Sequence, residues 1–150
     1  MVFEKDFREF CSLLNEEKID YLIVGGYAVA FHGAPRSTGD IDILVRPEQE
    51  HVVRVLAAIE RFGFPTLGVT SEYLLVHGKI LQLGRVPVQI HVMSSITGVD
   101  WNEAWDSRQQ GLYGGVPVFF IGLAALIANK AAAARPKDIA DIKALRAKGV

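Results

Sequence analysis

An apolar segment, a pair of glycines and an Asp-x-Asp segment follow one another in residues 22–45, which read LIVGGYAVAFHGAPRSTGDIDILV. Apolar and polar residues alternate over Asp40–Val45, which predicts a strand with Ile41 and Ile43 on one face and Asp40 and Asp42 on the other. Carboxylates at positions i and i+2 of a strand lie on the same side, roughly 7 Å apart at the backbone. They can therefore converge on one hard cation, and Mg²⁺ is the expected ion.

The glycine pair, Gly25 and Gly26, separates a short apolar strand predicted at 21–24 from a helix predicted at 27–32. Because glycine has no Cβ, a triphosphate could approach this backbone closely and meet the amide groups at the start of the helix. A glycine pair is usually only a turn, and an acidic strand face is usually only a solvated face. It is their order and spacing that favour a binding site.

Three further residues stand directly before the acidic strand: Arg36, Ser37 and Thr38. They offer a cation and two hydroxyl groups, which suit the oxygens of a phosphate. We therefore include them among the candidate phosphate-binding residues.

The rest of the chain also alternates between helices and strands. Phe7, Phe10 and Leu14 recur at three- and four-residue spacing, which predicts an amphipathic helix that ends before Ile19. The other predicted elements are a helix at 47–62, strands at 73–76, 80–83 and 86–92, a tight turn around Gly84 and Arg85 between the last two strands, a short helix at 102–107, a strand at 116–121, and helices at 123–134 and 136–147. This order predicts a single α/β domain over residues 1–150.

Composition and charge exclude several classes of protein. A formal net charge of −1 gives no reason to expect the sequence-independent phosphate binding of a strongly basic protein. The single cysteine, Cys11, excludes an intramolecular disulfide and a cysteine cluster for zinc. The charged first ten residues do not resemble a signal peptide, and glycines and a proline interrupt the uncharged stretch at 111–129. We expect a cytoplasmic protein with no membrane partner.

Segment 22–45 resembles the signature of the nucleotidyltransferases of the DNA polymerase β superfamily: a hydrophobic residue, a glycine pair, a gap and Asp-x-Asp. The resemblance implies an α/β (α+β) nucleotidyltransferase fold, in which a mixed β-sheet is flanked by helices and further helices follow at the C-terminal end. It also implies that Gly25 and Gly26 hold a nucleoside triphosphate. Asp40 and Asp42 would bind two divalent metal ions, expected to be Mg²⁺, which drive nucleotidyl transfer to a hydroxyl or similar acceptor.

Two later segments, VPVQIHVMSSITGVDWNEAW and LIANKAAAARPKDIADIKAL, resemble parts of small bacterial nucleotidyltransferase-like proteins of poorly defined function. Lys130, in the second segment, is a candidate nucleotide-binding residue. The charged residues of this segment could equally form an ordinary solvated helix surface. They are Lys130, Arg135, Lys137, Asp138 and Asp141.

A departure from the superfamily occurs at His91. Catalytic members place a third carboxylate on a later strand beside the Asp pair, and His91 stands at the matching position. Strand alternation places Gln89 and His91 on one face, opposite Val88 and Ile90. A neutral imidazole brings no negative charge, so we expect a weaker second Mg²⁺ site. His91 could be a general base, a metal ligand or a structural strand residue.

The leading hypothesis is a Mg²⁺-dependent nucleotidyltransferase that moves a nucleoside monophosphate from a nucleoside triphosphate to an acceptor, with Asp40, Asp42 and His91 as catalytic residues. The acceptor could be a nucleic acid, a protein or a small molecule, and the chain could form a homo-oligomer or bind a partner protein. The alternative is an inactive module that binds a nucleotide or a protein, for example in a toxin–antitoxin type system, since His91 replaces the carboxylate. A third possibility is an interaction scaffold with a vestigial cleft.

Overall fold

The computed structural model describes residues 4–36, 38–66, 68–85 and 88–148. Within these ranges the chain forms helices and strands in the order α1 (Lys5–Glu16), β1 (Tyr21–Val24), α2 (Gly25–Phe31), β2 (Asp40–Val45), α3 (Gln49–Phe62), α4 (Ser71–Leu75), β3 (Ile80–Arg85), β4 (Val88–Met93), α5 (Trp101–Asp106), β5 (Gln109–Tyr113), β6 (Val116–Phe120), α6 (Leu123–Ala133) and α7 (Pro136–Ala147).

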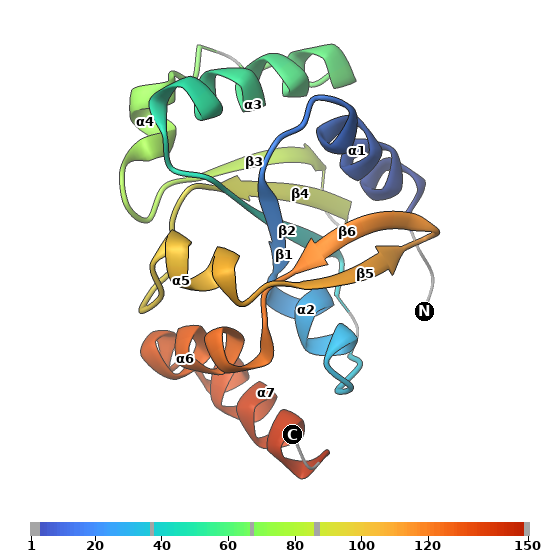
Figure 1. Cartoon of the computed structure of the whole chain (residues 1–150), viewed down its shortest axis with the longest axis vertical. Helices are drawn as coiled ribbons and strands as arrows, with labels where there is room; N and C mark the ends of the chain where they lie inside the picture. The colour runs from blue at the N-terminus through green and yellow to red at the C-terminus, as the bar shows by residue number, and fades with distance from the viewer. Residues whose placement is uncertain (1–3, 37, 67, 86–87, 149–150) are drawn as a thin grey trace.

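The strands form one mixed sheet in the order β3-β4-β2-β1-β6-β5 (Figure 1). Strand β2 pairs in parallel with β4 and antiparallel with β1, while β1 pairs in parallel with β6. Each edge of the sheet is an antiparallel pair, β3 with β4 and β5 with β6. The predicted α/β fold with a mixed sheet is confirmed.

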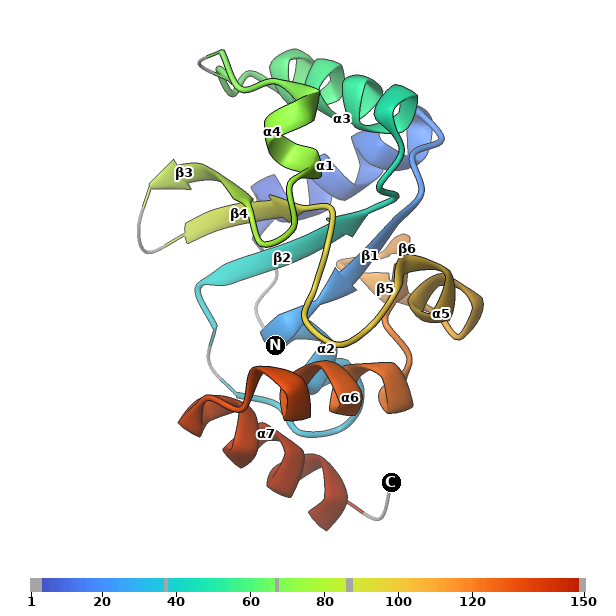
Figure 2. The ribbon, with the colours of Figure 1, turned by 90° about the vertical axis from the view of Figure 1, so that its left-hand side faces the viewer.

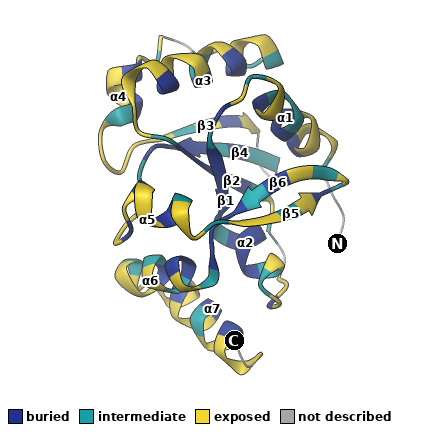
Figure 3. Cartoon of the chain, in the orientation of Figure 1, coloured by how far each residue is buried: buried dark blue, intermediate teal, exposed yellow. Residues whose placement is uncertain are grey.

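Helices cover both faces of the sheet, with α1, α3 and α4 on one side and α2, α6 and α7 on the other (Figures 1 and 2). All four residues of β1 are buried, and Ile41 and Ile43 of β2 have no exposed surface (Figure 3). Asp40 and Asp42 alternate with these two isoleucines and are only partly buried. The predicted alternation therefore places the apolar residues of β2 in the core and leaves both carboxylates accessible.

Aromatic side chains join α1 to the opposite layer and to the sheet. The ring of Tyr27 in α2 makes edge contacts with Phe7 in α1, at 6.0 Å between centroids, and with Tyr113 in β5, at 5.4 Å. All three rings are at least 95% buried, and burying each contributes on the order of 2 kcal/mol. These contacts fix α2, and with it the glycine pair that begins this helix.

Two predictions of local structure were wrong, and one strand was missed. Residues 73–76 are not a strand: helix α4 ends at Leu75, and it begins after Thr70, whose side chain caps it by accepting a hydrogen bond from the Tyr73 amide at 3.1 Å. The predicted turn at Gly84 and Arg85 is wrong, because both residues belong to strand β3 and pair with β4. Val86 and Pro87, which follow them, lie outside the described residues. Strand β5 was not predicted.

In the described part of the chain, no helix combines the length and the apolar composition needed to cross a membrane.

Candidate active site

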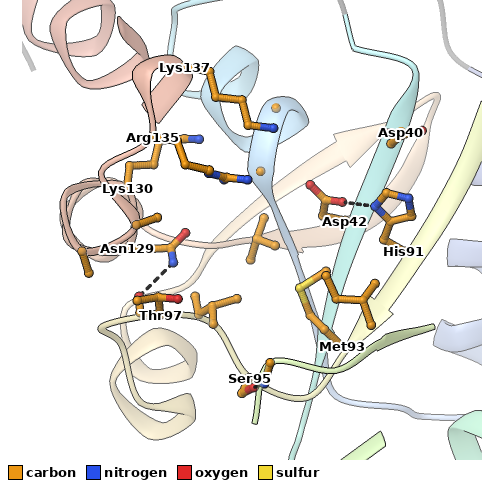
Figure 4. A pocket seen from close by; sticks show the side chains of 18 of the residues that line it. Asp40, Asp42, His91, Met93, Ser95, Thr97, Asn129, Lys130, Arg135 and Lys137 are labelled. Carbon is orange, nitrogen blue, oxygen red and sulfur yellow. Dashed lines mark hydrogen bonds and ion pairs between the residues drawn. The ribbon is translucent and has the colours of Figure 1, made fainter. Parts of the chain in front are cut away.

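A cavity of about 670 Å³ lies on the sheet face that carries the two aspartates of β2. Residues of its lining come from the end of β1, the start of α2, strands β2, β3 and β4, and helices α6 and α7 (Figure 4). A volume of this size is ordinary for a small-molecule site. The cavity thus brings together elements from both halves of the chain.

Asp40 and Asp42 form one wall of the cavity together with residues of the neighbouring strands. In the parallel pairing of β2 with β4, Asp42 lies opposite His91 and Asp40 lies opposite Gln89. His91 lies in turn opposite Gln82 of β3. Since paired residues of neighbouring strands point to the same side of a sheet, a polar row crosses three strands at Asp42.

The two glycines pack directly against this row and against the segment that precedes β2. Gly25 has a φ of +67°, and a Cβ added there would collide with Oδ2 of Asp42. A Cβ on Gly26 would lie 3.1 Å from Oγ1 of Thr38 and 3.3 Å from Nη2 of Arg36. Glycine is therefore required at Gly25 by its backbone conformation and by the approach of Asp42.

His91 holds Asp42 through a side-chain contact. Its Nδ1 donates to Oδ1 of Asp42 at 3.1 Å (Figure 4). Its Nε2 lies 3.3 Å from Oε1 of Gln89. The hydrogen bond to Asp42 raises the pKa of His91 above its ordinary value, and burial of the ring only partly offsets this effect. Both ring nitrogens face acceptor oxygens, an arrangement that a protonated imidazole satisfies.

The donor atoms of this wall suit one magnesium ion better than two. The described residues contain no group of three or more His, Cys, Asp or Glu side chains arranged to hold a metal ion. Mg²⁺ commonly takes one or two protein carboxylates and completes its shell with substrate phosphates and water. Asp40 and Asp42 fit that requirement for one ion, whereas His91 supplies no third carboxylate for a second.

Basic side chains line the opposite wall. Lys130 in α6 is only 4% exposed, and its Nζ lies 2.9 Å from Oδ2 of Asp141 and 3.2 Å from Oδ1 of Asp138. Arg36 makes a two-pronged contact with Asp141, at 2.9 Å through Nε and 3.2 Å through Nη2. The interpretation of these charges as an ordinary solvated helix surface is therefore wrong for Lys130, Asp138 and Asp141, which are all buried.

Asp138 illustrates the electrostatics of this wall. Burial alone would raise the pKa of its carboxyl group. Hydrogen bonds from Arg135 and Lys130, together with the charge of Lys130, outweigh burial and lower the pKa of Asp138 to about 2. The carboxylate is thus held in its charged form by the cations around it.

Most of the site residues predicted from the sequence line this one cavity: Gly25, Gly26, Arg36, Thr38, Asp40, Asp42, His91 and Lys130. Ser37 lies outside the described residues. The hydroxyl of Thr38 donates to the backbone oxygen of Asp40 at 3.1 Å, so one of its contacts orients the start of β2.

Sequence reasoning missed other residues of the lining, namely His77, Gln82, Ser95, Thr97, Asn129, Arg135 and Lys137. The first four come from β3 and from the loops that flank the β3–β4 pair, whose position depends on strand pairing. Only Arg135 and Lys137 had a local signal, since both stand in the charged segment with Lys130.

Comparisons with known proteins agree with this fold. A family model described as nucleotidyltransferase of unknown function (DUF6036) matches residues 5–147. No curated protein matches the chain in sequence.

Similar solved structures include the lincosamide antibiotic adenylyltransferase LnuA bound to lincomycin, with a TM-score of 0.64 and 17% identity over 97% of each chain. The antibiotic-resistance factor ANT(2'')-Ia has a TM-score of 0.67 and 17% identity, over 97% of this chain and 83% of the other. An antigenic nucleotidyltransferase-like protein from Paracoccidioides brasiliensis has a TM-score of 0.57 and 17% identity, over 96% of this chain and 77% of the other. At these identities the similarity is one of fold.

Proposed function

Because the chain belongs to the DUF6036 family of nucleotidyltransferases of unknown function, we propose that it transfers a nucleoside monophosphate from a magnesium-bound nucleoside triphosphate to a hydroxyl group of a small molecule. The acceptor oxygen forms a bond to the α-phosphorus. The bond between the α-phosphorus and the oxygen that links it to the β-phosphorus breaks. Pyrophosphate leaves with the electron pair, and the hydroxyl proton passes to solvent or to a base.

One observation carries this proposal: an acidic wall and a basic wall face each other across a single cavity. Asp40 and Asp42 stand on the sheet, and Lys130, Arg135 and Lys137 lie across the cavity from them (Figure 4). Arg36 is a fourth cation of the described lining and is joined to Lys130 through Asp141. A triphosphate carries more negative charge than one Mg²⁺ neutralises, so it needs both a metal site and additional cations. The cavity offers both.

Each wall would have a distinct task. Asp40 and Asp42 would hold Mg²⁺, which when bound withdraws charge from the phosphate oxygens and aligns the α-phosphorus. Gly26 carries no side chain, so Thr38 and Arg36 can pack closely against the start of α2, where backbone amides would face a phosphate. Arg36 and Lys130 would stabilise the charge that develops on the departing pyrophosphate.

We assign His91 to the orientation of Asp42 rather than to proton removal. A general base needs a ring nitrogen that can take the acceptor proton, and in His91 the side chains of Asp42 and Gln89 already occupy both nitrogens. The contact with His91 fixes one oxygen of Asp42 and leaves Oδ2 on the side of Gly25. This role is compatible with a slow enzyme that lacks the second metal site.

The part of the cavity lining away from Asp40 and Asp42 supports a small acceptor with hydroxyl groups. Among the described residues this part carries no acidic side chain and presents Gln82, Ser95, Thr97 and Asn129 beside Ile80 and Met93. A concave site with a few polar groups among apolar ones is typical of small-molecule recognition. LnuA was solved with lincomycin bound and ANT(2'')-Ia with adenylyl-2''-tobramycin, which makes small molecules the first acceptors to test.

A second candidate function is nucleotide binding without turnover. The contact between His91 and Asp42 favours it, because this contact engages one of the two oxygens of a metal ligand. Such a protein would bind a nucleoside triphosphate in the same cavity and release it unchanged.

The test combines calorimetry with a transfer assay. Titration with Mg²⁺ and each of the four ribonucleoside triphosphates should show binding that disappears in Asp40→Asn and Asp42→Asn. Asp106→Asn is the matched control, because it makes the same change at an exposed position at the end of α5, outside the cavity. Transfer of an α-³²P label to an acceptor mixture, with loss of transfer in Asp40→Asn, distinguishes the enzyme from the binding module.

Two results would contradict the proposal. Full transfer by Asp40→Asn would exclude the metal assignment. Absence of nucleotide binding in the unaltered protein, with each nucleotide and with Mg²⁺ present, would exclude both candidate functions.

A further inference from the structure

The charged side chains between the cavity and α7 are arranged in two layers. Arg36, Lys130 and Arg135 line the cavity, whereas Asp138 and Asp141 lie behind them and are not part of its lining. Asp138 has no exposed surface and Asp141 has 4%. An arrangement with cations in front and carboxylates behind presents positive charge to the cavity.

Asp141 connects Arg36, in the loop before β2, to Lys130 in α6. It accepts from both Nε and Nη2 of Arg36 and from Nζ of Lys130. A bidentate contact fixes the plane of a guanidinium group as well as its position. Asp141 therefore joins two cations from distant parts of the chain.

The position that Asp141 gives to Arg36 is next to the glycine pair. Nη2 of Arg36 lies 3.3 Å from the point where a Cβ on Gly26 would be. The guanidinium therefore packs closely against the glycine pair at the start of α2. A phosphate bound to the backbone amides at this helix start would lie near Arg36.

Asp138 holds the second half of the cationic layer. It accepts from Nζ of Lys130 at 3.2 Å, and from Nε and Nη2 of Arg135 at 2.6 Å and 3.1 Å. It also accepts from the backbone amide of Arg135 at 3.1 Å, which caps the start of α7. Lys130 is thus held from two sides by carboxylates on the same helix.

Stability alone is a weak explanation for such a network. Taking a lysine and two carboxylates out of water carries a desolvation cost, and apolar residues of similar size often stabilise a fold equally well. Preorganisation is a better explanation, because a binding site gains affinity when its charged groups are already fixed.

We propose that Asp138 and Asp141 are positioning residues, which hold Arg36, Lys130 and Arg135 as a preformed cradle for the polyphosphate part of the nucleotide. This inference rests on the proposed function for the identity of the ligand. It does not require that the chain catalyse transfer.

The test is the affinity of the protein for inorganic tripolyphosphate, measured by calorimetry with and without Mg²⁺. Asp141→Asn keeps the shape of the side chain and removes its charge. General electrostatics predicts tighter anion binding in this variant, because a negative charge near the site is lost. The positioning role predicts the opposite: binding weaker by about tenfold or more, as expected when one or two charge-assisted hydrogen bonds are misplaced.

Asp20→Asn is the matched control. Asp20 also forms an ion pair with an arginine, at 2.8 Å to Nε of Arg46, but it precedes β1 and is not among the lining residues. This variant should bind tripolyphosphate within about twofold of the unaltered protein, since its lost contact lies outside the cradle. All titrations are made at a temperature where circular dichroism shows each variant to be folded.

A second variant keeps the test decisive if Asp141→Asn does not fold. Arg36→Lys retains the positive charge of a half-exposed side chain but removes the two-pronged contact with Asp141. It should also weaken tripolyphosphate binding by about tenfold.

Three outcomes would overturn the inference: unchanged or tighter binding by Asp141→Asn, unchanged binding by Arg36→Lys, or no binding of tripolyphosphate by the unaltered protein. Failure of the proposed function is a separate result. If Asp141→Asn weakens tripolyphosphate binding but no acceptor is ever labelled, the positioning role of Asp141 is supported and the proposed transfer reaction is not.

Discussion

Nδ1 of His91 lies 3.1 Å from Oδ1 of Asp42, across two parallel strands and at the same register position. In the superfamily that the sequence resembles, a third carboxylate is expected at this position. The structure places an imidazole there that touches one member of the aspartate pair. The properties of the site should therefore respond strongly to a change at His91.

His91→Asp should strengthen Mg²⁺ binding and increase transfer by about tenfold or more, because a carboxylate restores a ligand for a second ion. Without Mg²⁺ the same variant should be less stable, since two carboxylates then repel each other. Thermal unfolding with and without Mg²⁺, together with label transfer, measures both effects. His77→Asp adds the same charge elsewhere in the cavity lining and should give neither.

Gly25→Ala should lose Mg²⁺-dependent nucleotide binding and stability together. A side chain at a φ of +67° costs roughly 1–2 kcal/mol, and the added Cβ also collides with Asp42. Gly115→Ala separates the two effects, because Gly115 has a φ of +87° and no heavy atom within 4 Å of the added Cβ. Urea unfolding and calorimetry on both variants provide the comparison; equal losses in the two would show that the collision does not matter.

Asp138 should contribute stability that depends on pH. Its pKa falls from an ordinary value of 3.8 to about 2 in the folded protein, because the hydrogen bonds from Arg135 and Lys130 outweigh burial. The contribution, about 2 kcal/mol, is present above the ordinary pKa and is lost as the pH falls through the folded one. The difference in unfolding free energy between the unaltered protein and Asp138→Asn should therefore narrow from about pH 5 to about pH 2. A constant difference over that range would contradict the assignment.

Cys11 should resist thiol reagents until the protein unfolds. Its side chain has no exposed surface, and burial raises the pKa of the thiol to about 12, with a hydrogen bond to Tyr21 only partly opposing this. Since Cys11 is the only cysteine in the chain, labelling by Ellman's reagent directly reports opening of the core around α1. One thiol should react promptly in guanidinium chloride and slowly without it. Fast labelling of the folded protein would show that α1 detaches locally.

The sequence predicted best the elements whose own residues decide their structure. Three elements have the expected bounds. Strand β1 ends where the glycine pair begins, β2 follows the alternation of its residues, and α7 begins at Pro136, in the first helical position. The edge strand β5 was missed because its residues, QQGLY, show no alternation, and it is a strand only through its pairing with β6. Helix α4 was mistaken for a strand because the capping role of Thr70 was not recognised.

The acidic half of the site was more predictable than the basic half. Asp40 and Asp42 are two residues apart on one strand, so local geometry alone places them together. Lys130 and Arg36 come from different elements and are joined through Asp141, which binds both. The buried state of these charges is a tertiary property, and no local pattern distinguishes it from a solvated helix surface.

Arg36 and Asp141 are 105 residues apart in the chain, and their contact completes the basic wall. Closing a loop of that length has a large entropic cost, which is recovered only when both ends are already embedded in native structure. Asp40 and Asp42 are two residues apart, so the acidic wall depends on a short stretch of the chain. The basic wall cannot be complete until helix α7, which carries Asp141, has docked. During refolding, the recovery of polyphosphate binding should therefore lag behind the recovery of helical circular dichroism and coincide with the last kinetic phase.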